Sequence, residues 1–278
     1  MKTLITLAGL TLLTVLPLRL SGPPSGAAGT EDPAPAAPAA AEPAHERQES
    51  LDLEAVLAAS GMRADLEAGV LAVPVRVLVK NDLLEYLLVG PRGAGHESLF
   101  QTEVTPSLIN AVALAAGFTE GKNAALRPAE DGGTFVRDPL GAPTYFYAAW
   151  REGEETYLYR VEDLLTNLDT GRSMKRHGWV FLGSRFGSLR EGEDEVFLAD
   201  VEENLVNVTY FYQGNTLWTA ALPACVDQTI WAANAWLLPP RETPVWLVVS
   251  RKRLGALPAG WAEALPRVKR EVRDDSER

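Results

Sequence analysis

Apolar side chains recur at every second position in several parts of this sequence, and that periodicity constrains the fold more than any other feature. In residues 73–80 (VPVRVLVK) every odd position is valine, whereas Arg76 and Lys80 occupy even positions. Successive side chains of a strand point to opposite faces, so this segment predicts a strand with one buried face. The apolar segment 83–89 (LLEYLLV) follows a polar turn pair, and the two segments together predict a β-hairpin.

Strand signals also dominate the second half of the chain. Residues 145–150 and 156–160 predict two strands joined by the polar turn REGEE, and a short helix is expected at 161–168. The later apolar segments that we expect to form strands are GWVFLGSRF, EVFLAD, LVNVTYFY and VWLVVSRK.

Helix signals are few and short. Thr105 and Pro106 are typical of a helix start, because threonine caps helices and proline fits the first turn, and Gly117 marks the expected end. Another short helix is expected at 51–60. Together these signals predict the α+β class: a single domain of mainly antiparallel β-sheet with two or three short helices packed on it.

The N-terminal residues predict export. Lys2, an apolar run that ends at Leu18 and the small-residue stretch SGPPSGAAGT are typical of a secretory signal peptide. An uncleaved membrane anchor is the alternative, although the run is shorter than the ~20 residues that a bilayer-spanning helix needs. The predicted location is therefore the periplasm or the extracellular space. The expected division is a signal peptide (1–28), a disordered Pro/Ala-rich spacer (29–49), the α+β domain (50–254) and a charged C-terminal tail (255–278).

Charge and cysteine content exclude several classes of function. The chain has 37 acidic and 26 basic residues, which argues against a nucleic-acid partner because phosphate binding rests on clustered Lys and Arg. Cys225 is the single cysteine, so this chain alone provides neither a disulfide nor a cysteine-ligated zinc or iron–sulfur centre. Its apolar surroundings predict a buried thiol, and no cofactor is predicted.

The stretch GAGHESLFQTEVTP (93–106) is typical of an active-site loop in composition. His96 and Glu97 suggest a zinc-protease motif, but its helical form needs a second histidine where this chain has Phe100. In a strand, His96 and Glu97 would point to opposite faces and could not serve one site. A turn at Gly95 would relax that restriction.

His177, in MKRHGWVFLGSRFG, is the second candidate histidine. Together with His96 and a carboxylate such as Asp200, it would form a minimal metal or acid–base site if the fold brought them together. The alternative is that both histidines are structural residues hydrogen-bonded to loop backbone. His45 lies in the spacer and is set aside. Neither a G-x-S-x-G elbow nor a phosphate-binding glycine loop is present.

Four segments, in the same order, resemble the YdjY domain family over about residues 51–252. They are GHESLFQTEVTPSLINAVALAAGF, YRVEDLLTNLDTGRSMKRHGWVFLGSRF, EVFLADVEENLVNVTYF and LLPPRETPVWLVVSRK. The resemblance implies an exported domain of unassigned biochemical function. Some members are described as ferredoxin-like or iron–sulfur proteins, but the single cysteine excludes a cysteine-ligated cluster here. The family positions present are His96, Glu97, Ser98, Trp179, Phe181, Gly183, Ser184 and Asp200.

The sequence therefore predicts a non-enzymatic module of the cell envelope that binds a protein, a glycan or a small ligand in a cleft near His96. The membrane would be contacted only through an uncleaved N-terminal segment. The candidate binding residues are Ser98, Trp179 and Ser184. The alternative is a metal-assisted or acid–base hydrolase, with His96 and His177 as metal ligands or catalytic groups and Glu97 or Asp200 as the carboxylate.

Overall fold

A computed structural model describes residues 53–80, 82–190, 192–212 and 214–269 of the protein. Its centre is a closed β-barrel of eight strands in the order β2-β17-β7-β11-β15-β14-β3-β4, which closes where β4 pairs with β2. The strands are β2 (Val70–Val77), β17 (Pro244–Ser250), β7 (Pro143–Glu152), β11 (Trp179–Phe181), β15 (Trp218–Thr219), β14 (Asn204–Asn207), β3 (Tyr86–Val89) and β4 (Ser98–Gln101).

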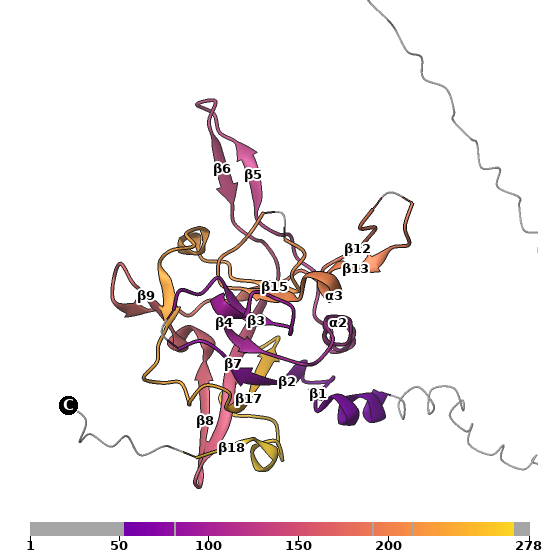
Figure 1. Ribbon diagram of the computed structural model, residues 1–278, viewed down its shortest axis with the longest axis vertical. Helices are drawn as coiled ribbons and strands as arrows, with labels where there is room; N and C mark the ends of the chain where they lie inside the picture. The colour runs from indigo at the N-terminus through magenta and orange to yellow at the C-terminus, as the bar shows by residue number, and fades with distance from the viewer. Residues whose placement is uncertain (1–52, 81, 191, 213, 270–278) are drawn as a thin grey trace, which may run out of the picture. The chain divides into compact units, whose positions relative to one another are not determined.

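Shorter elements surround the barrel. Strand β1 (Arg63–Asp65) pairs with β2, and both β8 (Glu155–Arg160) and β18 (Arg267–Val268) pair with β7. Small separate sheets are formed by β9 (Leu165–Asn167), β10 (Arg172–Ser173) and β16 (Trp231–Ala233), by β12 (Phe186–Gly187) and β13 (Val196–Phe197), and by β5 (Ala125–Pro128) and β6 (Thr134–Arg137). The β5–β6 hairpin projects away from the barrel (Figure 1).

Helical elements are few. The α-helices are a segment at 53–60, α2 (Pro106–Ala115) and α3 (Leu198–Glu202), and the 3-10 helices are η1 (Gly95–Glu97), η2 (Val161–Leu164), η3 (Pro223–Val226) and η4 (Ala262–Ala264). Helix α2 begins at Pro106 after the cap residue Thr105, and Gly117 has a left-handed φ of 77°, as predicted. The helix expected at 161–168 is only one 3-10 turn followed by β9.

The predicted fold class is wrong, since the described residues form a mostly β structure around a closed barrel rather than an open α+β sheet with helices packed on it. The predicted hairpin of 73–80 with 83–89 is also wrong. Strands β2 and β3 do not pair with each other, because β4 lies between them and pairs with both. Periodicity identified these strands, but their partners depend on contacts distant in sequence.

The barrel core confirms the alternation seen in the sequence. Val73, Val75 and Val77 are buried in the main core together with Phe146 and Leu247. The opposite faces of β2, β7 and β17 are buried in a second cluster beneath the C-terminal segment. Its members include Ala72, Tyr147, Trp246, Val248, Trp261 and Leu265.

The packed body extends beyond the predicted boundary at residue 254. Trp261 is 8% exposed, Leu265 is 4% exposed, and β18 adds a parallel strand to β7. Residues 255–268 of the segment expected to be a tail therefore cover one face of the sheet. The predicted signal peptide and the whole predicted spacer, His45 included, lie outside the described residues. Within the described ranges, the helices are all too short or too polar to cross a membrane.

Candidate functional site

His96 and Glu97 lie on the 3-10 turn η1, just before β4, and not within a strand. Their side chains approach each other, with 3.5 Å between His96 Nε2 and Glu97 Oε1, so the expectation that they point to opposite faces is wrong. Gly95 starts this turn, which is the exception the sequence allowed. The His96 side chain is 79% exposed, so this pair lies at the surface rather than in an enclosed site.

His96 and Glu97 also affect the pKa of a third side chain, the carboxyl group of Glu85. Burial, and then the neighbouring Glu97 carboxylate, raise the pKa of Glu85, while His96 opposes the shift. Across residues 53–80, 82–190, 192–212 and 214–269, however, no group of three or more His, Cys, Asp or Glu side chains is arranged to hold a metal ion.

His177 lies in different surroundings, packed on a buried ion pair. Its ring stacks on Trp179 with 5.1 Å between the ring centroids, and its Nδ1 lies 3.2 Å from the Lys175 carbonyl oxygen. Its side chain is only 8% exposed, and burial lowers its pKa, against the opposing effect of Glu162. These contacts fit the alternative in which His177 is a structural histidine hydrogen-bonded to loop backbone.

The carboxylate beneath His177 is fully buried and fully paired. Arg160 Nε donates to Glu162 Oε2 over 2.9 Å, and Arg160 Nη2 donates to Glu162 Oε1. The indole of Trp179 and the backbone N–H of His177 donate to the same carboxylate over 3.1 and 3.3 Å. Because four donors converge on one buried acceptor, Glu162 organises this end of the barrel and is not available as a catalytic base.

The burial of His177 gives a testable pH dependence. Because its pKa is lower in the folded than in the unfolded state, the unfolded chain binds the proton first as the pH falls. The free energy of unfolding should therefore decrease as the pH falls from about 6.5 toward the folded-state pKa. Urea unfolding between pH 8 and pH 5 should show this loss in the wild type and a smaller loss in His177→Gln. An identical pH dependence in the two proteins would contradict the assignment.

Asp200 has a structural role at the start of helix α2. Its Oδ1 accepts the backbone N–H of Ser107 over 2.8 Å, and its carbonyl oxygen accepts from Arg92 Nη2 over 2.6 Å. Thr105, the cap residue, makes no side-chain bond to the helix, so Asp200 supplies that acceptor from another element. His96, His177 and Asp200 thus belong to three separate sets of contacts, and the structure does not bring them together.

Two of the three candidate binding residues are part of the core. Ser98 is fully buried and its hydroxyl donates to the Phe100 carbonyl oxygen over 2.9 Å. Trp179 is fully buried in the barrel. Ser184 lines a cavity, on the loop between β11 and β12.

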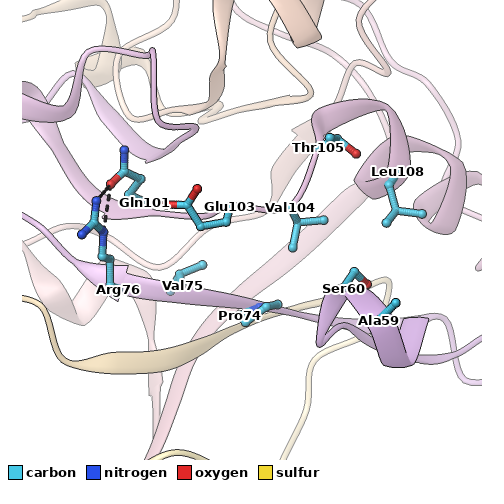
Figure 2. A pocket seen from close by; sticks show the side chains of 10 residues that line it. All are labelled: Ala59, Ser60, Pro74, Val75, Arg76, Gln101, Glu103, Val104, Thr105 and Leu108. Atoms are coloured by element: carbon cyan, nitrogen blue, oxygen red, sulfur yellow. Dashed lines mark hydrogen bonds between the residues drawn. The ribbon is translucent and has the colours of Figure 1, made fainter. Parts of the chain in front are cut away.

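The sequence predicts a cleft near His96. The structure has a groove beside residues 101–108, which follow His96 in the chain. An open groove of about 470 Å³ runs between β2 and residues 101–108, with the helical segment 53–60 at one end. Figure 2 shows Pro74 and Val75 on one side of the groove and Val104 and Leu108 on the other. These side chains give it a mostly apolar surface.

The other end of the groove is charged. Arg76 Nε donates to Gln101 Oε1 over 2.9 Å, and Arg76 Nη1 pairs with Glu242 over 2.6 Å, so the Arg76 charge is already compensated. Glu103 is exposed beside them and has no ion-pair partner among the residues that the structure describes (Figure 2). The groove thus combines an apolar surface with one uncompensated carboxylate.

The fold and the groove define the class of this protein as a closed eight-stranded β-barrel with an open amphipathic groove between β2 and residues 101–108. Comparisons with protein-family models, with curated proteins and with solved structures give no significant match for this chain. The resemblance to the YdjY family stays a prediction.

Sequence reasoning missed the residues that shape the groove. The alternation of residues 73–80 placed Arg76 on the polar face of a strand. That pattern could have indicated the side of the groove that β2 forms. Glu103 was visible only as part of the segment leading into helix α2, and Leu108 only as an apolar residue of that helix. Three separated segments form the groove, and no local pattern could have joined them.

Proposed function

We propose that this protein is a non-enzymatic binding module of the cell envelope, and that its groove takes an amphipathic cation. The proposal rests on the Glu103 carboxylate, which has no ion-pair partner within the described part of the chain and lies beside the apolar surface formed by Pro74, Val104 and Leu108. An apolar ligand body would be removed from water along that surface, while its cationic group would neutralise Glu103. The excess of acidic over basic residues in the chain favours the approach of cations.

Arg76 does not reverse this preference. Its guanidinium already faces Glu242 and the Gln101 side chain, so an anionic ligand would have to compete with an existing ion pair. A cation approaching Glu103 meets no such competition. The geometry therefore favours an ammonium or guanidinium group joined to a hydrocarbon or aromatic part, the chemistry of an amine or of a Lys- or Arg-containing peptide segment.

The test compares three probes of the same shape on the full-length protein: 2-phenylethylammonium, 2-phenylethanol and phenylacetate. We expect the ammonium compound to bind best in a titration followed by nuclear magnetic resonance. Glu103→Gln should reduce its affinity about two- to fivefold, the size typical of an exposed charge pair, and should leave 2-phenylethanol unaffected.

Two further variants make the result specific. Leu108→Asn should weaken all three probes, because it replaces an apolar side chain of the groove with a polar one and adds no charge. Glu130→Gln removes an equally exposed charge from the turn between β5 and β6 and should change nothing. Equal affinities for the ammonium and the carboxylate probe, or equal effects of Glu103→Gln and Glu130→Gln, would refute the proposal.

A further inference from the structure

A second cavity, formed by different segments, is polar. It has a volume of about 470 Å³ and is lined by the loop at 182–185, by residue 212 and residues 214–216, and by the loop at 121–123. It shares no residue with the groove. Its side chains are mainly hydroxyls, amides, a guanidinium and one tyrosine, the groups that bind hydroxylated ligands.

Ser184 is the first unusual feature of this cavity. It has a left-handed φ of 56° directly after Gly183, whose φ is 72°. That conformation is costly for a residue other than glycine and is commonly found at functional positions. The buried Ser184 Oγ has no hydrogen-bond partner within the described part of the chain. An unpaired buried hydroxyl destabilises a fold, so its presence beside a polar cavity indicates a ligand-binding role.

Arg185 and Tyr212 supply the groups that a ligand could contact from solvent. Arg185 is exposed and makes no ion pair within the ranges that the structure describes, which leaves its guanidinium donors free. Tyr212 is 49% exposed at the same cavity and offers an aromatic face.

The loop that carries Tyr212 is held in place from the other side of the cavity. Asn123 Nδ2 donates to the carbonyl oxygens of Phe211 and Gly214 over 2.9 and 3.4 Å, and Asn123 Oδ1 accepts from the Ala124 backbone. Asn215 in turn donates to Glu202. The backbone at Phe211 and Gly214 and the side chain of Asn215 are therefore positioned before any ligand arrives, which lowers the entropy cost of binding.

We infer that this cavity is a carbohydrate-binding site. Sugar hydroxyls both donate and accept, and they match the mixture of free donors on Arg185 with the hydroxyl of Ser184 and the amide oxygen of Asn215. The ring of Tyr212 fits the apolar face of a pyranose. A simple anion fits less well, because Asn215 of this cavity donates to the Glu202 carboxylate, whose negative charge would repel an anion bound beside it. This inference is independent of the groove.

The test is binding of the full-length protein to an array of neutral and acidic oligosaccharides. We expect the wild type to bind at least one neutral glycan, and Tyr212→Ala to reduce that affinity about tenfold through loss of the aromatic contact. Phe135→Ala, which removes another half-exposed aromatic ring from the β5–β6 hairpin, should bind as the wild type does.

Ser184→Ala separates binding from stability. Alanine experiences similar strain at this φ, and it removes the unpaired hydroxyl, so thermal stability should stay the same or rise while glycan binding falls. A wild type that binds no glycan would overturn the inference, as would glycan binding that is unchanged in both Tyr212→Ala and Ser184→Ala.

Discussion

Arg160→Met should lower the free energy of unfolding by about 3–5 kcal/mol, the loss typical of removing one partner from a buried ion pair. The Arg160 side chain is 9% exposed and Glu162 is fully buried, so solvent cannot replace the missing guanidinium. Glu162 would keep only the Trp179 indole and the His177 backbone as donors. Arg160 also lies over the rings of Tyr145 and Tyr147, and those contacts would weaken too. Urea unfolding followed by circular dichroism measures the change.

The chain provides a matched control for this prediction. Arg176 pairs with Asp163 over 2.6 Å, but the Arg176 side chain is 62% exposed. Arg176→Met should therefore cost less than about 1 kcal/mol. Adding Glu162→Leu to Arg160→Met should recover part of the loss, because no unpaired charge then remains buried. Equal losses in Arg160→Met and Arg176→Met would show that burial of the Arg160 pair does not matter.

Long, regular segments of this fold could be predicted from the sequence. Strand β2 was visible because valine occupies alternate positions, and β7 and β8 were visible as two aromatic segments around a polar turn. Helix α2 could be predicted because Thr105 and Pro106 are typical of a helix start and Gly117 is typical of a helix end. In each case the information lies within about a dozen neighbouring residues.

Closure of the barrel could not be predicted in this way. The seam between β15 and β14 is a parallel pairing of very short strands, and β4 joins two strands that looked like a hairpin. Short strands carry too few alternating positions to fix a partner, so distant contacts decide the pairing. The sequence therefore predicted many of the strands, but the arrangement predicted for them was wrong.

The candidate site residues were chosen by residue type or by resemblance, and neither reports where a side chain lies in the fold. The resemblance of His96-Glu97 to an active site rested on residue type, but an exposed turn places that pair in water. Arg160 and Glu162 were ignored because charged residues are almost never fully buried unless they are paired, and two charges in one short segment suggest a surface. Ser184 was named through the family resemblance and lines a cavity, and its role in binding stays a prediction.

Phe100→Ala should lower the free energy of unfolding by about 3–5 kcal/mol, the cost of emptying a phenylalanine site in a core. Phe100 is fully buried on β4, where it is paired with Val77 of β2 and with Leu88 of β3. It therefore fills the core at the strand that closes the barrel, and truncation would leave a cavity that the flanking strands cannot easily collapse. Unfolding in guanidinium chloride, monitored by tryptophan fluorescence, would measure the loss.

Phe135→Ala is the control for Phe100→Ala, because Phe135 is 51% exposed on the β5–β6 hairpin and its removal should change stability by less than about 0.5 kcal/mol. Phe100→His tests directly whether position 100 faces the core. It completes the spacing of a zinc-protease motif, but it also buries an imidazole in the barrel core. That variant should be destabilised like Phe100→Ala and should retain no zinc after dialysis. A stable Phe100→His protein that binds zinc would mean that position 100 faces the surface beside His96, and the closure of the barrel through β4 would then be incorrect.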